Sequence, residues 1–381
     1  MNAPIVIVGG GLAAGRAVTE LREAGHEDEV VLFAQEPDVP YERPPLSKGY
    51  LQGQESREST YVQSRGWYGE HNVDLRLGEP VEALDLAEKT VRSSRGATPF
   101  HRLLLATGAR PRTLDLHSTD EIDVRYLRTL PDSTGLQERL GAGRHLLVLG
   151  AGWIGMEAAA SARTLGTTVT VVEPAELPLL AALGPEVASR FADVHRGHGV
   201  DLRTSTSLDR LEGATAVLSD GTEVKPDTVL VGIGVVPNVS LAEDAGLSVD
   251  NGILVDAGLR SSHPEVFAAG DVANAEHPVL GERIRVEHWQ NAISQGEAAA
   301  HALLGEPVSY ADLPYFFTDQ YDLGMEYFGH ARGADDVQLE PGDSDDAFSC
   351  WWRRDGQLVA AMHVNEWDRS DELRERVASG S

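Results

Sequence analysis

The sequence predicts an α/β fold made of two doubly wound parallel sheets, with a small α+β domain at the C-terminal end. Three observations support this prediction: short apolar runs alternate with alanine-rich segments, one strand–turn–helix unit occurs twice, and the pattern changes after Leu304. Continuous apolar runs are typical of strands buried on both faces, as in parallel sheets covered by helices. Their alternation with helices indicates the α/β class.

The individual elements follow from these runs. The predicted strands are the apolar runs at residues 5–8, 30–33, 103–106, 146–149, 169–172, 229–231 and 266–269. The predicted helices are the alanine-rich segments at residues 13–24, 156–165 and 292–304, the last extended back to His288. In the C-terminal region, strands at 348–352 and 358–363 flank an Asp355-Gly356 turn, and residues 335–346 are predicted to be a solvated loop.

The repeated unit defines the domains. Residues 5–18 read IVIVGGGLAAGRAV and residues 146–159 read LLVLGAGWIGMEAA, so each is a strand, a glycine turn and a helix in order. Two such units predict two Rossmann-like dinucleotide-binding domains. The first domain is predicted to be discontinuous, with residues 1–113 and 238–308. The second covers residues 114–237, and the C-terminal domain covers residues 309–381.

The first glycine turn has the pattern of a phosphate site. It reads Gly9-Gly10-Gly11-Leu12-Ala13-Ala14, with a small residue at the third position of the GxGxxG/A pattern. Gly9 permits the tight turn, Gly11 lets the backbone approach a pyrophosphate, and Ala14 allows close helix–strand contact. The helix N-terminus then offers free N–H groups and positive potential to the phosphates.

The second glycine turn adds a signal about the nucleotide. It reads Gly150-Ala151-Gly152-Trp153-Ile154-Gly155, and Glu173 ends the next predicted strand, 23 residues after Gly150. A carboxylate at that position accepts hydrogen bonds from ribose hydroxyls and repels a 2′-phosphate. Residues 174–177 contain no Arg or Lys that could bind this phosphate. The sequence therefore predicts NADH rather than NADPH at this site.

Charge and cysteine content exclude several classes of protein. The 381 residues carry a formal net charge of −28, so neither nucleic acid nor an anionic membrane is expected as a partner. The one cysteine, Cys350, excludes an internal disulfide, a thiolate zinc site, an iron–sulfur cluster held by this chain and a redox dithiol. No histidine pattern predicts a metal site. Without a basic N-terminal segment or an apolar run near the roughly 18–20 residues of a membrane span, the protein is expected to be cytoplasmic.

Further motifs carry a family resemblance. They are PYERPPLSK (40–48), LLLATGARPR (103–112), YLRT (126–129), GIGVVPN (232–238), VFAAGDVA (266–273) and VEHWQNAISQG (286–296). With the two glycine turns, and in this order, they make the chain resemble the FAD-dependent NADH–ferredoxin reductases of oxygenase systems (the putidaredoxin reductase-like family). Apoptosis-inducing factor is a more distant resemblance. The segment FFTDQYDLG (316–324) matches more loosely, and Phe317 stands where many members have Trp.

The resemblance implies FAD in the first site and NADH in the second. The residues expected at FAD are Gly9, Gly11, Ala14, Gly15, Gln35, Glu36, Arg43, Lys48, Val81, Ala106, Thr107, Gly108, Arg128, Gly270, Asp271, His288 and Trp289. The residues expected at NAD(H) are Gly150, Gly152, Ile154, Gly155, Glu157, Glu173 and Gly234. The family usually holds the adenosine ribose with an acid at the position of Gln35, so either Gln35 or Glu36 is expected to do so here.

The resemblance also implies the catalytic residues. Lys48 matches the lysine beside the flavin N5, and Glu157, on the first turn of the second helix, matches its ion-pair partner. The pair would orient the nicotinamide and adjust the flavin potential. The helix that begins at His288 would point its N-terminus at the flavin N1–C2=O edge and favour the anionic reduced form. Trp289 is expected either in the core or as a wall of the flavin site.

These features together predict a FAD-dependent NADH oxidoreductase that passes single electrons to a [2Fe–2S] ferredoxin serving an oxygenase or a cytochrome P450. Residues 44–48 hold no thiol pair, so a disulfide reductase mechanism is unavailable. The alternatives are an NADH oxidoreductase with a quinone, oxygen or another small acceptor, and a redox-sensing flavoprotein with NADH-dependent oligomerisation. A monomer or homodimer is expected, with residues 283–285 and 353–354 as candidate basic docking sites for the ferredoxin.

Overall fold

The structure is a computed structural model and describes residues 3–116, 118–344 and 346–381. The chain divides into two compact units. The first comprises residues 1–43, 58–110 and 236–315, and the second comprises residues 44–57, 111–235 and 316–381. The division into three domains stays a prediction. The second unit contains both the second glycine turn and the C-terminal strands.

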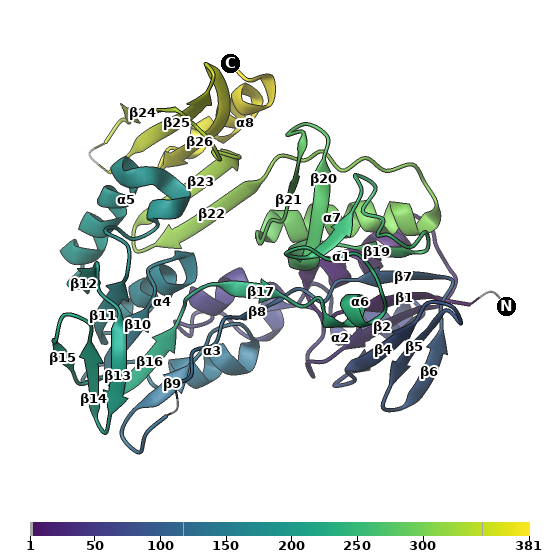
Figure 1. Cartoon of the computed structure of the whole chain (residues 1–381), viewed down its shortest axis with the longest axis horizontal. Coiled ribbons are helices and arrows are strands. Elements are labelled where there is room, and N and C mark those ends of the chain that lie inside the picture. Colours follow the sequence, from purple (N-terminus) through teal and green to yellow (C-terminus); the bar gives the residue numbers. More distant parts are fainter. Residues whose placement is uncertain (1–2, 117, 345) are drawn as a thin grey trace. The chain divides into compact units, whose positions relative to one another are not determined.

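The first unit is built on a parallel five-stranded sheet of order β19-β7-β1-β2-β3 (Figure 1). Four of its strands are predicted apolar runs, and they are buried on both faces. The strands are β1 (Ile5–Val8), β2 (Val30–Ala34), β3 (Val73–Leu77), β7 (Arg102–Leu105) and β19 (Val266–Ala268). The doubly wound sheet predicted for the N-terminal repeat is therefore confirmed.

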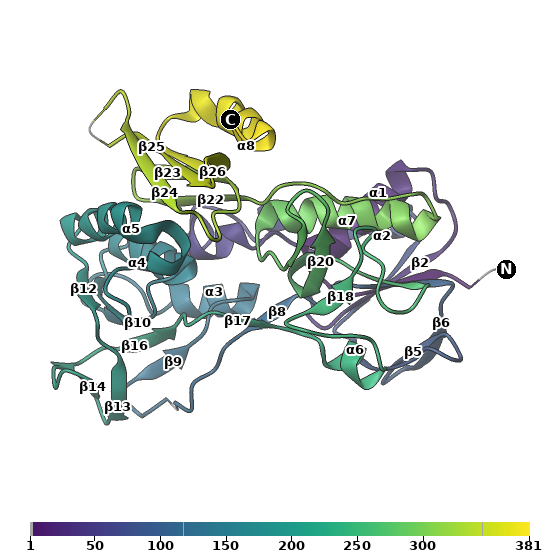
Figure 2. The same cartoon turned by 45° about the horizontal axis from the view of Figure 1, so that its top comes forward.

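Two helices of the first unit, α1 (Leu12–Glu23) and α7 (Trp289–Leu304), pack against each other (Figures 1 and 2). They approach so closely that a Cβ at Gly296 would lie 2.6 Å from the carbonyl oxygen of Ala13. Helix α7 begins directly after His288, as the extended prediction has it. The start of α1 thus packs against the middle of α7.

Shorter elements complete the first unit. They include an antiparallel sheet of three strands and a second small sheet in which β18 and β20 are parallel. They are β4 (Val81–Asp85), β5 (Thr90–Ser93), β6 (Gly96–Pro99), β18 (Ile253–Val255), β20 (Ala273–His277), β21 (Glu282–Ile284), α2 (Arg65–Glu70), α6 (Ser240–Asp244), η2 (Glu58–Thr60) and η3 (Gly270–Val272).

The second unit is also built on a parallel sheet of five strands. Its parallel sheet has the order β12-β11-β10-β16-β9. The strands are β9 (Asp123–Arg125), β10 (His145–Leu149), β11 (Thr168–Glu173), β12 (Asp201–Thr204) and β16 (Thr228–Val231). The helices are α3 (Leu130–Gln137), α4 (Trp153–Thr164) and α5 (Leu180–Gly197), preceded in the chain by η1 (Pro44–Ser47). A small antiparallel sheet consists of β13 (Leu208–Glu212), β14 (Thr215–Leu218) and β15 (Glu223–Val224). Two further strands, β8 (Ala109–Pro111) and β17 (Val235–Pro237), lie where the chain passes between the units.

The observed start of helix α4 differs from the predicted start. It begins at Trp153, three residues before the predicted start, because Gly152 is already its N-cap. Glu157 therefore lies in the second turn of the helix rather than in the first. The alanine-rich composition marked the body of the helix, whereas the glycine turn determines where it starts.

The C-terminal segment forms a five-stranded sheet of order β22-β23-β26-β25-β24, and α8 (Ser370–Ser379) contacts β23 and β26 (Figure 2). The strands are β22 (Tyr315–Gln320), β23 (Leu323–Gly329), β24 (Asp336–Pro341), β25 (Phe348–Arg354) and β26 (Gln357–Val364); η4 (Trp367–Arg369) leads into α8. The predicted α+β character is confirmed. Asp355 and Gly356 both have positive φ, 51° and 78°, which suits a tight hairpin turn.

One prediction for this sheet is wrong. Residues 336–341 form strand β24 instead of a loop, and β24 pairs antiparallel with β25. Apolar and polar side chains alternate along this acidic segment. Val337 and Leu339 pack against the core, while the residues next to them are exposed. Alternation over so few residues is a weak signal beside so much charge.

Candidate functional site

The first glycine turn has the geometry of a dinucleotide site. Gly9 has φ +134°, and a Cβ on it would lie 2.0 Å from the carbonyl oxygen of Ala106, so only glycine fits. Ala14 is fully buried, and a Cβ at Gly15 would lie 2.8 Å from Pro40. A Cβ at Gly11, by contrast, would meet no described atom within 4 Å. The turn is therefore closed on its inner side and open at Gly11, where a pyrophosphate would approach.

The second glycine turn repeats this arrangement. Gly150 has φ +97°, and a Cβ there would lie 2.6 Å from the carbonyl oxygen of Gly232. A Cβ at Gly155 would lie 2.1 Å from the oxygen of Gly150, whereas at Gly152 it would meet no described atom within 4 Å. Ile154, at the start of α4, is 47% exposed, so its side chain is accessible to a ligand at this turn.

Both helix starts are suited to anions. No described side chain caps the first turn of α1 or of α4, and neither first turn contains an acidic residue. The free N–H groups of such a turn carry partial positive charge and bind phosphate oxygens. The residues present therefore fit a dinucleotide in each unit.

Glu173 is the last residue of β11 and lies against the second turn. Its Oε2 accepts a hydrogen bond from the amide of Ala151 at 2.7 Å, and its Oε1 accepts one from the amide of Ala175 at 2.9 Å. Each carboxylate oxygen can accept a second hydrogen bond. Glu173 can therefore hold the turn and bind ribose hydroxyls at the same time.

In the first unit, the equivalent position is the end of β2, where Gln35 and Glu36 are the two candidates for binding the adenosine ribose. Their surroundings differ. Glu36 accepts hydrogen bonds from Tyr41 at 2.5 Å and from Arg43 at 3.0 Å, and this pair with Arg43 is half-buried. Gln35 directly follows β2 and is exposed. The carboxylate of Glu36 is thus engaged by its own neighbours, while the amide of Gln35 faces outward.

Several other predicted FAD residues lie near the first turn. The carbonyl of Ala106 approaches Gly9, and Thr107 exchanges two hydrogen bonds of 2.8 Å with Asn238. The amide of Gly270 donates to the buried Gln295 on α7, which links η3, the location of Asp271, to that helix. Asn238 and Gln295 are not among the predicted site residues, although they lie inside the motifs at 232–238 and 286–296.

The other predicted cofactor residues are distributed over both units. In the first unit, Gly108 has φ +64°, Val81 begins β4, and Trp289 begins α7, where it packs against the core. In the second unit, Arg128 precedes α3 and Gly234 has φ +95°.

Lys48 and Glu157 form the predicted ion pair. Lys48 Nζ lies 2.8 Å from Glu157 Oε1, although the two residues are far apart in the sequence. Glu157 is only 3% exposed. Its carboxylate also accepts a hydrogen bond of 2.5 Å from Ser47 at Oε2 and one of 2.6 Å from Thr318 at Oε1. Phe317 contributes its ring to the same place, with its centroid 5.4 Å from Lys48 Nζ.

A buried polar chain continues from Thr318. Gln320 donates to Thr318 at 3.1 Å, and the other end of its amide lies 2.7 Å from Nε2 of His195 on α5. Burial lowers the pKa of His195 to about 4, so this ring is neutral at physiological pH. Sequence reasoning missed this chain because Thr318 is 161 residues from Glu157 and no spacing rule joins them.

Comparison with known proteins assigns these features to a family. Residues 3–296 match the family described as pyridine nucleotide-disulphide oxidoreductase, and residues 315–381 match the one described as reductase C-terminal. This chain belongs to the pyridine nucleotide-disulphide oxidoreductase family. The predicted resemblance is thereby confirmed.

Relatives within this family are similar over almost the whole chain. The ferredoxin–NAD(+) reductase component of the anthranilate 1,2-dioxygenase system of Burkholderia cepacia is 39% identical, over 99% of this chain and 95% of the relative. Rhodocoxin reductase of Rhodococcus erythropolis is 36% identical, over 95% of this chain and 86% of the relative. The reductase in the crystal structure of the covalent putidaredoxin reductase–putidaredoxin complex is 33% identical with a TM-score of 0.94, and the match covers 100% of this chain and 94% of that one.

This member of the pyridine nucleotide-disulphide oxidoreductase family has no accessible thiol. Cys350, its one cysteine, lies on β25 and is fully buried. Burial raises the pKa of the Cys350 thiol to about 12, so it is protonated at physiological pH and a poor nucleophile. Electrons cannot pass through a cysteine pair of this chain.

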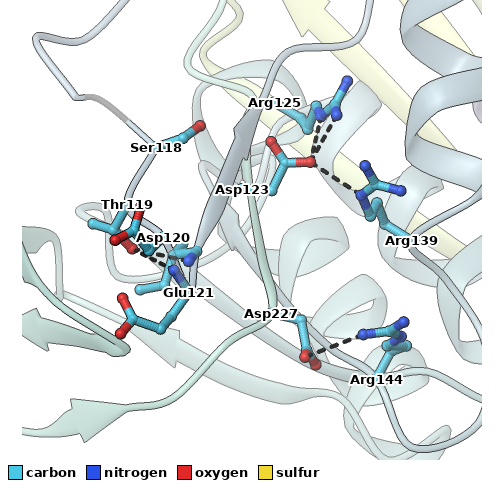
Figure 3. A pocket seen from close by; sticks show the side chains of 10 residues that line it. Ser118, Thr119, Asp120, Glu121, Asp123, Arg125, Arg139, Arg144 and Asp227 are labelled. Atoms are coloured by element: carbon cyan, nitrogen blue, oxygen red, sulfur yellow. Dashed lines mark hydrogen bonds and ion pairs between the residues drawn. The ribbon is translucent and has the colours of Figure 1, made fainter.

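A pocket of about 380 Å³ lies beside β9 in the second unit (Figure 3). Its wall is charged, and several of the charges are paired: Asp123 binds Arg125 and Arg139, and Asp227 binds Arg144. No predicted cofactor or catalytic residue is among the described residues that line it. The pocket is therefore separate from the sites considered above.

Residues 3–116, 118–344 and 346–381 contain no group of three or more His, Cys, Asp or Glu that could hold a metal ion. No helix in these ranges is long and apolar enough to cross a membrane.

The buried His195 predicts a pH dependence of stability. The pKa of its ring is about 4 in the folded protein and about 6.5 in an exposed chain, so the unfolded state binds the extra proton. The free energy of unfolding should therefore fall as the pH drops from about 6.5 to about 4, by about 3 kcal/mol at most. Urea unfolding followed by tryptophan fluorescence at several pH values measures this slope.

His195→Gln should flatten the unfolding profile in this pH window. The control is His301→Gln, because Glu306 raises the pKa of His301 and its removal should leave the acid-side loss in place. A wild-type slope in His195→Gln would contradict the prediction.

Proposed function

We propose that this protein is a FAD-dependent oxidoreductase that takes hydride from NADH and passes single electrons to a [2Fe–2S] ferredoxin, which supplies an oxygenase or a cytochrome P450. The observation that carries the proposal is the extent of the similarity. It includes the C-terminal segment, residues 315–381, as well as the two glycine turns, in relatives named as ferredoxin reductases.

The first unit holds FAD in this proposal. The turn from Gly9 to Ala14 binds the pyrophosphate, and the exposed Gln35 binds the adenosine ribose because Glu36 is engaged by Tyr41 and Arg43. FAD, when bound, supplies the chemistry that accepts two electrons together and releases them one at a time. The N-terminus of α7 contributes partial positive charge that favours an anion near it.

The second unit holds NADH. The turn from Gly150 to Gly155 binds its pyrophosphate, and Glu173 accepts hydrogen bonds from the ribose hydroxyls. A 2′-phosphate would bring like charge against Glu173, so NADPH is disfavoured. Lys48, held by Glu157, would offer a fixed positive charge and N–H donors to the nicotinamide and flavin during hydride transfer.

Two pairs of arginines were predicted as docking residues for an acidic ferredoxin. Arg283 forms an ion pair with Glu276 at 2.6 Å, and Arg285 forms one with Glu287 at 2.5 Å, so this pair adds little net positive charge. Arg353 and Arg354, at the end of β25, therefore stand as the preferred candidates.

The experiment that tests the function is NADH-driven reduction of cytochrome c by the purified flavoprotein, with and without a panel of [2Fe–2S] ferredoxins. We expect a large, saturable increase in rate with at least one ferredoxin. If NADH bleaches the flavin but no ferredoxin accelerates turnover, the ferredoxin part is wrong. The protein would then use a small acceptor, or act as a redox sensor.

Lys48→Ala should slow the reduction of bound flavin by NADH about 10- to 100-fold, because a charge-assisted hydrogen bond contributes roughly 1.5–3 kcal/mol. Stopped-flow spectroscopy of flavin bleaching measures the rate. Lys89→Ala is the matched control, since Lys89 also binds a glutamate, Glu265 at 2.6 Å, but at the surface. Equal rates in the two variants would remove Lys48 from the reaction.

Glu173→Ala should lower the preference for NADH over NADPH, expressed as the ratio of the two kcat/KM values, about tenfold. Glu176→Ala removes the same charge from an exposed position nearby and should keep the wild-type ratio. Since Glu173 also holds the turn, Glu173→Gln, which keeps the side-chain shape, separates the loss of charge from a loss of structure. An unchanged ratio in both Glu173 variants would contradict the role.

A further inference from the structure

A continuous chain of buried hydrogen bonds runs from the ion pair to helix α5. It links Glu157 to Thr318 at 2.6 Å, Thr318 to Gln320 at 3.1 Å, and Gln320 to His195 at 2.7 Å. These four residues are each 3% exposed or less. They come from α4, β22 and α5, three elements of the second unit. Thr318 and Gln320 reach the same face because alternate side chains of a strand point the same way.

The ion pair determines the direction of this chain. An ionised Glu157 can only accept, so Thr318 must donate its single O–H to it. The hydroxyl oxygen of Thr318 then accepts from the amide nitrogen of Gln320, which turns the amide oxygen toward His195. His195 must therefore carry its proton on Nε2. Its Nδ1 is left as an acceptor, 3.5 Å from the hydroxyl of Tyr321.

Every donor in the chain thus points toward Glu157. Dipoles aligned in this way reinforce one another in a medium of low polarity and stabilise a negative charge at the end that they face. The chain therefore favours one orientation of the Glu157 carboxylate.

Lys48 has a second acidic neighbour. The charge of Asp319 interacts with Lys48, Glu157 and Glu326. Asp319 lies between Thr318 and Gln320 in β22, on the exposed face of the strand. A carboxylate that is free to rotate would compete poorly for Lys48 against this neighbour, whereas one that is also held by Ser47 and Thr318 keeps its place.

We propose that Thr318, Gln320 and His195 are positioning residues that hold the Glu157 carboxylate in the orientation in which it binds Lys48. The C-terminal segment thereby contributes to the site through Thr318 and Gln320. The consequence for flavin reduction rests on the proposed function, in which Lys48 acts on hydride transfer. The effect should decrease along the chain, from Thr318, which touches Glu157, to His195.

The three lysines of the chain, Lys48, Lys89 and Lys225, allow a direct test. The full-length flavoprotein is treated with an amine-acylating reagent, and mass spectrometry measures the labelling rate of each lysine. Thr318→Val has the shape of threonine without its hydroxyl, and we expect it to raise the labelling rate of Lys48 about tenfold while Lys89 and Lys225 keep theirs. Thr318→Ser, which retains the hydroxyl, should restore the wild-type rate.

Gln320→Met provides a second variant in case Thr318→Val fails to fold, and it should raise Lys48 labelling by a smaller factor. Stopped-flow reduction by NADH is measured on the same samples. Faster labelling with unchanged flavin reduction supports the positioning and removes Lys48 from hydride transfer. Wild-type labelling of Lys48 in folded Thr318→Val or Gln320→Met overturns the proposal, whatever the rate of flavin reduction.

Discussion

The buried carboxylate of Glu157 is the constraint around which the second unit is arranged. An ionised group that is 3% exposed is stable only if cations and hydrogen-bond donors replace the water it has lost. Lys48 and Ser47 come from one end of η1, and Thr318 comes from β22. One charge thus brings together three segments that are distant in the sequence. Removing any of these donors leaves a buried charge less compensated, which is why the surroundings of Glu157 are so specific.

The two glycine turns impose a different kind of constraint, which is purely steric. At Gly9 and Gly150, the residue that follows a neighbouring parallel strand, Ala106 after β7 or Gly232 after β16, lies so close that its carbonyl oxygen occupies the place of a Cβ. The strand and helix can then meet at a sharp angle, and the helix start is open at Gly11 and Gly152. The same solution occurs in both units, so one local sequence pattern produces two sites of one shape. The strand ends then differ: Glu173 holds its own turn, while Glu36 is bound by Tyr41 and Arg43.

Membership of the pyridine nucleotide-disulphide oxidoreductase family does not bring disulfide chemistry with it here. The segment from Pro44 to Lys48 carries a hydroxyl and an amine, and both are directed to Glu157. Cys350 is buried in the C-terminal sheet, where its thiol is a packing group. The same sheet provides Thr318 and Gln320 to the polar chain. The C-terminal segment therefore combines a hydrophobic core with a polar edge that reaches the ion pair.

The parallel strands, the two glycine turns and the acid that follows the second turn could be predicted from the sequence because their signals are local. These signals are a run of apolar residues, a spacing of glycines and a carboxylate at a strand end. The sequence also indicated the Lys48–Glu157 pair, but through family resemblance, since no spacing rule joins these residues. Three features emerge only from the folded chain: Glu36 is engaged while Gln35 is exposed, residues 336–341 form a strand, and Thr318, Gln320 and His195 extend the ion pair. Hydrogen bonds to a buried charge depend on distance in space, which is set by packing and not by local sequence.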